Sequence, residues 1–306
     1  MTVRRLMLVA LMIVSILTME ATIPAYVIYS IYTYSSTGWW LWLPILSVVI
    51  AAIVAIMPWC QFIPYFARPI VPLAMVAAAG HARGLLGACA SAAFLLAAWA
   101  LIRRWLNGDS LRLEAIEISP PLAPGVYFVG QGGGNSEVNH HFRNESQRFA
   151  LDILRLNWLT MRAWGFFPQR LGRYAIYSTQ VLCPVAGVVT AVVDGLPDTD
   201  PLVQRDTDHI AGNHIVIRCA GASTFVGLAH LLAGSIQVRV GDAVSAGQPL
   251  ARVGNSGNTT EPHLHIHAKV GGAPDSMLDG QGVPLRIRGR FLMRNDLFRG
   301  LSLRKG

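Results

Sequence analysis

The sequence predicts N-terminal transmembrane α-helices followed by a mainly β domain. Its 306 residues are 53% hydrophobic and only 14% charged, with a mean hydropathy of +0.43, which is too apolar for an ordinary soluble domain. The apolar excess lies in residues 1–106, which contain one acid, Glu20, and six basic residues, all arginine. Beyond residue 106 the composition is that of a globular domain, and glycines separate short runs of β-forming residues.

Three long apolar stretches predict a membrane domain over residues 1–106 with about three transmembrane helices. They cover residues 6–32, 39–57 and 84–102, whereas the apolar stretch at 69–79 is only about half of a ~20-residue span. With three spans, the positive-inside rule places Arg4, Arg5, Arg68 and Arg83 in the cytoplasm. The soluble domain then lies outside the membrane. The arginines at 103 and 104 oppose this orientation, and a fourth span would reverse it.

The rest of the chain divides into a linker, a β domain and a tail. Residues 107–124 are the expected linker, because SPPLAPG is rich in proline and cannot be helical. Residues 125–284 are the expected globular domain, with one short helix near 157–164 and a polar loop at 194–212. Its candidate strands are 181–193, 214–218, 224–230, 236–240, 249–253 and 263–270.

The net charge of +8 does not indicate a nucleic-acid partner. Residues 107–284 hold 12 Lys and Arg against 15 Asp and Glu, so the domain itself is slightly acidic. The basic excess of the last 22 residues, seven basic side chains against one acid, predicts a solvated C-terminal tail at 285–306. A second interpretation of that tail is attraction to anionic lipid or to an acidic wall polymer.

Two of the four cysteines, Cys183 and Cys219, lie in the soluble part. They lack the CxxC spacing of a thiolate zinc site. If the domain lies outside the cytoplasm, a disulfide between them is possible, and two separate buried thiols are the alternative.

The segment NSGNTTEPHLHIH, residues 255–267, is the most informative in the chain. His263, His265 and His267 alternate with Leu264 and Ile266. In a strand, this period of two places the three imidazoles on one face and the aliphatic side chains on the other. Imidazole is the commonest protein ligand for zinc, so this face predicts a metal site if other segments supply further ligands.

Two other segments supply candidate groups. NHHFRNESQRFALD, residues 139–152, contains His140, His141 and Asp152, and GLAHLL places His230 between apolar residues. Three protein ligands of nitrogen and oxygen type leave a fourth tetrahedral position for water, which is the arrangement of a catalytic zinc site. No HExxH glutamate is present, so the base must come from elsewhere, and His230 and His263 can accept a proton from the water if they lie within reach of it.

These segments together resemble the lysostaphin-type (LytM-like) family of zinc metalloendopeptidases. The resemblance covers about residues 127–273 and lies in GNHIVIR, the tripeptide AHL, VRVGDAVSAGQPLARVGNSGNT and EPHLHIH, which occur in the family's order. It implies antiparallel sheets of the duplicated-hybrid-motif or barrel-sandwich kind. It also implies a zinc metallopeptidase domain over residues 125–284 that holds one Zn²⁺.

Carried over residue by residue, the resemblance implies the metal ligands His141, Asp152 and His265 and the catalytic histidines His230 and His263. This chain departs from the usual pattern because His141 and Asp152 are 11 residues apart rather than a few. The intervening segment must therefore return Asp152 to the site, and His140 remains the alternative ligand. His267 shares the strand face of His265 and is interpreted as a surface residue, with a role in supporting the site or contacting substrate as the alternative. The remaining histidines, His140, His209 and His214, are expected to be structural or exposed.

The resulting interpretation is a membrane-anchored zinc metalloendopeptidase that hydrolyses peptide cross-links of peptidoglycan through a zinc-bound water. The expected location is the bacterial cytoplasmic membrane, multi-pass, with the catalytic domain on the periplasmic or extracytoplasmic side. The expected partners are a peptidoglycan peptide and the lipid membrane. The alternative is an inactive LytM-like module that binds the wall or activates another wall hydrolase.

Two unrelated families with similar motifs are excluded by single residues. A biotinyl or lipoyl carrier needs a lysine at its hairpin tip, and the only lysines are Lys269 and Lys305. A cupin needs a glutamate shortly after HxH, and the chain continues from His265 as IHAKVGGAPD.

Overall fold

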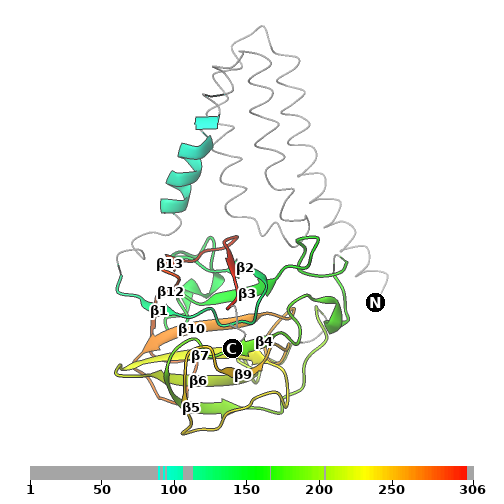
Figure 1. The fold of residues 1–306 in the computed structure, drawn as a ribbon, viewed down its shortest axis with the longest axis vertical. Helices are drawn as coiled ribbons and strands as arrows, with labels where there is room; N and C mark the ends of the chain where they lie inside the picture. The colour runs from blue at the N-terminus through cyan, green and yellow to red at the C-terminus, as the bar shows by residue number, and fades with distance from the viewer. Residues whose placement is uncertain are drawn as a thin grey trace, which may run out of the picture. The chain divides into compact units, whose positions relative to one another are not determined.

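The computed structural model describes residues 113–301, apart from 166 and 203–204, and residues 89, 92–93 and 95–105. The chain divides into two compact units, and residues 103–306 belong to the second. The described residues between 89 and 105 are helical (Figure 1). Within the part that the structure describes, no helix is both long and apolar enough to cross a membrane. The predicted spans at 6–32 and 39–57, the apolar stretch at 69–79 and the start of the span at 84–102 lie outside the described residues.

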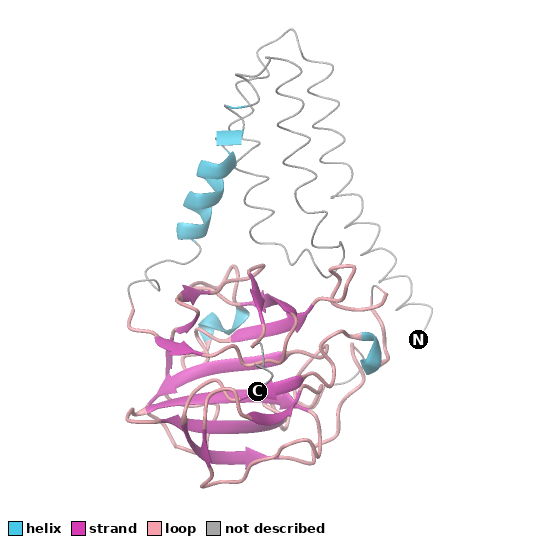
Figure 2. Ribbon diagram, in the orientation of Figure 1, coloured by secondary structure: helices cyan, strands magenta, loops and turns pink. Residues whose placement is uncertain are grey.

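Residues 113–301 are mainly β, as predicted (Figure 2). The strands are β1 (Ile116–Ile118), β2 (Val126–Gln131), β3 (Leu151–Arg155), β4 (Gln180–Leu182), β5 (Gly187–Val193), β6 (Asn213–Cys219), β7 (Thr224–Leu231), β8 (Ala243–Val244), β9 (Pro249–Arg252), β10 (Leu264–Val270), β11 (Gln281–Val283), β12 (Leu285–Ile287), β13 (Arg290–Phe291) and β14 (Leu297–Arg299). Two short 3-10 helices, His140–Arg143 and Leu171–Arg173, lie in the connections.

One nine-stranded sheet organises the domain. Its order is β14-β2-β3-β10-β7-β6-β5-β8, with β11 paired to β10, and all of its pairs are antiparallel. Figure 1 shows β10, β7, β6 and β5 side by side. A two-stranded sheet, β4-β9, and a three-stranded sheet, β1-β12-β13, complete the fold. Strand β10 is therefore central, and it lies between β3 and β7.

The two faces of β10 carry different chemistry. Leu264, Ile266 and Ala268 belong to the main hydrophobic core and are at most 1% exposed. His265 and His267 lie on the opposite face and are also buried. The predicted alternation of imidazoles and aliphatic side chains is confirmed. The interpretation of His267 as a surface residue is wrong, because β3, β7 and β11 all pair with β10 and a following loop covers this position.

A bulge in β7 turns His230 away from the core. Leu228 pairs with Ile215 and Leu231 with Asn213, so two β7 residues stand opposite one residue of β6. His230 has a φ of 61°, a left-handed conformation that costs a non-glycine residue free energy. Without the bulge, His230 would share the core-facing side of Leu228. With it, Leu231 enters the core and His230 faces the histidines of β10.

Residues 285–301 are not the solvated tail that their charge predicted. They form β12, which pairs in parallel with β1, β13, which pairs with β12, and β14, which pairs with β2. The reason is the apolar side chains between the arginines. Leu285, Ile287, Leu292 and Phe298 are buried in the main core. The basic residues at 304 and 305 lie outside the described part of the chain.

The segment at 157–164 is a turn rather than the predicted short helix. The side-chain carbonyl of Asn157 accepts hydrogen bonds from the backbone amides of Leu159, at 2.9 Å, and Met161, at 3.0 Å. Thr160 has a φ of 58°. Asparagine competes with helix formation by offering the backbone such local partners, and here the turn prevails.

Cys183 and Cys219 are thiols in this structure rather than a disulfide. Cys183 is buried, and its thiol donates to the backbone oxygen of Val185 at 2.9 Å. Burial raises the pKa of Cys183 to about 11, so the thiolate is scarce at neutral pH. Both residues therefore act as packing groups in the β5–β6 region.

Gly187 provides a test of the sheet packing. A Cβ atom at this position would lie 2.1 Å from the backbone oxygen of Arg218 on β6, so one of the two strands must move. We expect Gly187→Ala to lower the free energy of unfolding by about 1–3 kcal/mol, measured by chemical denaturation. Gly172→Ala is the matched control, because a Cβ there meets open space. Equal stability of the two variants would contradict the strand placement.

Candidate metal centre

The pairing of β3 with β10 places Asp152 directly opposite His265. The two residues are 113 apart in the sequence and form a register pair across the antiparallel strands. The Nδ1 atom of His265 lies 3.0 Å from Oδ1 of Asp152, and both side chains are buried. The central sheet thus holds a carboxylate oxygen and an imidazole nitrogen against one another.

Asn139 positions the third candidate ligand. Its side-chain nitrogen donates to the backbone oxygens of Gly133, Arg148 and Ala150, and its side-chain oxygen accepts from the backbone amide of His141. This buried asparagine therefore folds residues 133–150 into a compact loop. The loop carries the 3-10 helix His140–Arg143 and returns the chain to β3, as the 11-residue spacing required.

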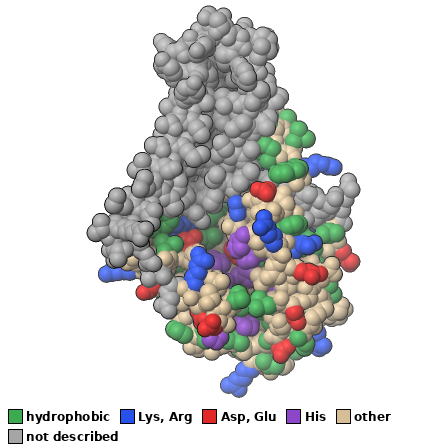
Figure 3. All heavy atoms as spheres, turned by 180° about the vertical axis from the view of Figure 1, so that it is seen from behind, with side chains coloured by type: hydrophobic (Ala, Val, Ile, Leu, Met, Phe, Trp, Pro, Cys, Tyr) green, Lys and Arg blue, Asp and Glu red, His purple; other side chains and the backbone are tan. Residues whose placement is uncertain are grey.

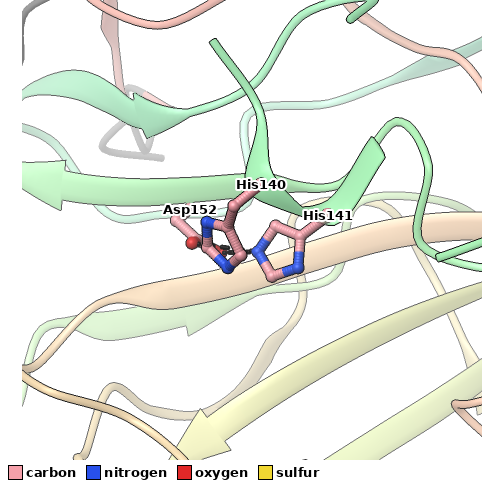
Figure 4. Close-up of side chains that lie close together, drawn as sticks. All are labelled: His140, His141 and Asp152. Carbon is pink, nitrogen blue, oxygen red and sulfur yellow. Dashed lines mark hydrogen bonds and ion pairs between the residues drawn. The ribbon is translucent and has the colours of Figure 1, made fainter. Parts of the chain in front are cut away.

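His141 reaches Asp152 more directly than His140 does. The Nε2 atom of His141 lies 3.0 Å from each carboxylate oxygen of Asp152, as Figure 4 shows. The ring of His140 packs against that of His141 with a tilt of 38° and 3.8 Å between centroids, and His140 is the more exposed of the two. His140, His141 and Asp152 can all offer ligand atoms within 4.8 Å of one another. That grouping omits His265, but the 3.0 Å separations from Asp152 favour His141 and His265 as its partners.

The donor set fits a zinc ion. Nε2 of His141 and Nδ1 of His265 both lie 3.0 Å from Oδ1 of Asp152, and nitrogen and oxygen atoms are the ligands of catalytic zinc sites. Zinc bonds of about 2.0–2.1 Å in a tetrahedral arrangement separate neighbouring ligand atoms by roughly 3.4 Å. The observed separations of 3.0 Å need to open by only a few tenths of an ångström.

Two further histidines point toward this centre in a defined tautomer. The Nδ1 atom of His230 lies 2.9 Å from the backbone oxygen of Ser256, and Nδ1 of His263 lies 2.8 Å from that of Glu261. A carbonyl oxygen only accepts, so each Nδ1 carries the hydrogen and each Nε2 keeps its lone pair. The two rings are 4.7 Å apart, and Nε2 of His263 lies 3.6 Å from Asp152 Oδ1.

Burial lowers the pKa of His230, His265 and His267, which favours their neutral forms. Burial, followed by the charges of His263 and His265, holds the pKa of His230 well below its ordinary range. Burial likewise lowers the pKa values of His265 and His267 to about 3. For Asp152, burial raises the pKa, but the charges of His141 and His263 and hydrogen bonds to its carboxylate outweigh that effect. Its pKa is well below its usual value, so Asp152 is ionised.

A cleft of about 360 Å³ opens onto the centre. Figure 3 shows histidine side chains gathered on this face of the domain, close to basic side chains. Thr260 and Glu261 form part of the wall opposite His140 and His141. The carboxylate of Glu261 is paired with Arg162 at 2.6 Å, which joins the cleft wall to the loop after β3. The cleft therefore gives a ligand access to His141 and Asp152, and to His230 and His263.

A family model matches part of the β domain. Residues 175–276 match the family model described as Peptidase family M23. This segment is an M23 peptidase domain. The matched residues include His230, His263 and His265, whereas His141 and Asp152 precede them. The recognition of a LytM-type peptidase from the sequence motifs is thus confirmed.

Several solved structures are similar to parts of this chain. A zinc-containing peptidase from Vibrio cholerae is 27% identical over 37% of this chain and 29% of that chain, with a TM-score of 0.25. The M23 protein EnpA from Enterococcus faecalis is 28% identical over 40% of this chain and 83% of its own, with a TM-score of 0.21. Lysostaphin from Staphylococcus simulans is 24% identical over 38% of this chain and 45% of its own, with a TM-score of 0.21. This chain spans less than a third of the Vibrio protein's length.

The structure brings together all five residues that the sequence singled out, and it adds supports that the sequence analysis missed. Asn139 holds the His141 loop, and the backbone oxygens of Ser256 and Glu261 accept hydrogen bonds from the rings of His230 and His263. Backbone acceptors leave no residue-type pattern, so no sequence motif identifies them. Asn139 was identifiable in principle, because asparagine before a short helical turn is a common cap.

His140 and His141 form a matched pair for testing the ligand assignment. We expect His141→Ala to lose zinc binding, because it removes the nitrogen that faces both oxygens of Asp152. His140→Ala should retain most of its zinc. Metal analysis after dialysis measures the zinc content of both variants. The reverse pattern would assign His140 as the ligand.

The buried histidines predict that the metal-free protein loses stability in acid. Their folded pKa values are lower than the ordinary 6.5, so the unfolded state binds more protons below pH 6.5. Stability should be complete above pH 6.5 and decline toward pH 3, by about 1.4 kcal/mol per pH unit for each such histidine. Chemical denaturation at several pH values measures this slope. A shallower slope is expected for His265→Gln, and a flat wild-type profile would contradict the burial of neutral histidines.

Proposed function

We propose that the domain is a zinc metalloendopeptidase that cleaves peptide bonds of peptidoglycan. The observation that carries this proposal is that His141 Nε2 and His265 Nδ1 each lie 3.0 Å from Asp152 Oδ1, beside a cleft lined by His141, Asp152, His230 and His263. Membership of a peptidase family supports the reaction type. The cell-wall substrate and the zinc dependence follow from the resemblance to lysostaphin-type enzymes.

His141, Asp152 and His265 would hold the ion. Zinc in such a site supplies Lewis acidity, which polarises a carbonyl group and lowers the pKa of water to about 7. The protein then has to move protons. His230 and His263 present unprotonated Nε2 atoms toward the centre, so either can accept a proton from attacking water. The resulting imidazolium can stabilise the tetrahedral oxyanion and protonate the leaving amine.

The hydrogen bonds at Nδ1 make these two histidines effective. A proton taken up at Nε2 leaves a cation whose Nδ1–H still donates to Ser256 O or Glu261 O. The carbonyl dipoles therefore stabilise the charged form and hold each ring in one orientation. The strained backbone at His230 is explained by this role, because it directs the ring into the site.

We further propose that the domain acts outside the cytoplasmic membrane, anchored by the apolar residues 1–106. Four of the six arginines in this segment, Arg4, Arg5, Arg68 and Arg83, support this orientation, whereas Arg103 and Arg104 oppose it. Peptidoglycan lies on that side of the membrane, and the polar cleft beside the histidines suits a peptide in an extended conformation. The alternative, an inactive module that only binds the wall, is disfavoured because every donor the reaction needs is present and converges.

Alanine variants separate binding from catalysis. We expect His265→Ala to lose zinc and activity together. His230→Ala and His263→Ala should retain zinc and lose turnover by about 10²–10⁴-fold, the usual contribution of a general base or acid. Metal analysis and an assay of peptide release from purified peptidoglycan provide the two measurements. Loss of zinc in His230→Ala or His263→Ala would reverse the ligand and base roles.

The substrate class is tested by mass spectrometry of fragments released from peptidoglycan by the purified protein. New amino termini within the stem or cross-bridge peptides are expected, and a chelator should abolish their release. Metal-bound protein that releases no fragments from any peptidoglycan type would favour the inactive module.

A further inference from the structure

His267 is a buried histidine to which the reaction assigns no role. It is 1% exposed and lies on the same face of β10 as His265, two residues further along. The Nε2 atom of His265 is 3.1 Å from Nδ1 of His267. Burying an imidazole costs desolvation free energy, which a hydrophobic side chain of similar size would avoid. The polar contact with His265 therefore suggests a role for the imidazole beyond packing.

The direction of this hydrogen bond follows from the candidate metal ligation. If Nδ1 of His265 binds zinc, its lone pair is used there and the ring hydrogen must be on Nε2. That N–H donates to Nδ1 of His267, which then acts as the acceptor. The hydrogen of His267 is therefore on Nε2. The imidazole of His267 also forms a hydrogen bond with the backbone of Met277, whose carbonyl oxygen can accept from this Nε2–H.

The loop that carries Met277 is fastened to the same strand. Lys269, also on β10, is buried and donates to Asp279 Oδ1 at 2.6 Å and to the backbone oxygen of Ala273 at 2.8 Å. Asp279 in turn accepts from the backbone amide of Ala273 at 2.7 Å. One buried ammonium thus fixes both ends of the loop, and with it the position of Met277.

Gly227 makes room for this arrangement on the neighbouring strand. It pairs with His267 in the β7–β10 register. A Cβ atom at Gly227 would lie 2.6 Å from the terminal carbon of Met277 and 3.2 Å from the His267 ring. A larger residue at this position would displace the end of the Met277 side chain and press on the imidazole, so glycine favours the close packing of the loop and His267 over β7.

We propose that His267 is a positioning residue that fixes the tautomer and orientation of the zinc ligand His265 through a relay to the Met277 backbone. This inference rests on the proposed zinc site. Groups that accept the second ring hydrogen of a ligating histidine typically contribute 10–100-fold to metal affinity. His267 fills that role with a second imidazole, and the loop clamped by Lys269 holds the far end of the relay.

The test is zinc affinity of the full-length protein, measured with zinc alone by competition against a chromophoric chelator. His267→Leu removes the acceptor and should weaken zinc binding 10–100-fold. His267→Asn places a side-chain oxygen where Nδ1 stands and should restore affinity to within about threefold of wild type. His209→Leu, at an exposed site in another loop, is the control and should bind zinc as wild type does.

The outcomes separate this inference from the proposed function. Wild-type protein that binds no zinc would overturn both. Wild-type affinity in His267→Leu, or equal weakening in the Leu and Asn variants, would overturn the relay alone, since a purely structural role does not depend on an acceptor. If His267→Leu does not fold, histidine ¹⁵N NMR of zinc-loaded wild type decides. Protonation of His267 at Nε2 supports the relay, and protonation at Nδ1 overturns it.

Discussion

The pairing of β10 with β3 on one side and β7 on the other is the constraint on which the site depends. It sets Asp152 opposite His265 and brings the end of β7, with His230, to the same face. A slip of one residue in either pairing would turn these side chains to the opposite face. The hydrophobic residues that alternate with them, Leu264 and Ile266, prevent such a slip because they would leave the core. The core therefore specifies the geometry of the site.

The site itself opposes stability. Several imidazoles and one carboxylate are buried together, and His230 adopts a strained backbone conformation. Hydrogen bonds to Ser256 O, Glu261 O and between the rings offset part of the desolvation cost. A bound cation would neutralise the negative charge of Asp152 and coordinate the ring-nitrogen lone pairs of His141 and His265. We infer that metal binding and the stability of this region are coupled, and that the proposed relay through His267 is part of the same arrangement.

The sequence predicted those features that depend on local periodicity and on motif order. Alternation in the HLHIH strand predicted its two faces, and the ordered motifs predicted the M23 domain. Features set by long-range contacts were not predicted. Residues 285–301 complete the sheets despite their charge, because β1 and β2 provide partners. The turn at Asn157 and the burial of His267 likewise depend on neighbours that no local pattern reveals.

The central claim is that pairing of distant strands assembles one zinc centre from His141, Asp152 and His265. X-ray absorption spectroscopy at the zinc edge of the metal-loaded protein tests it most directly. The predicted spectrum has a first shell of nitrogen and oxygen at about 2.0–2.1 Å, with the outer-shell scattering of two imidazoles. A sulfur shell at about 2.3 Å, or a spectrum without imidazole scattering, would contradict the assignment.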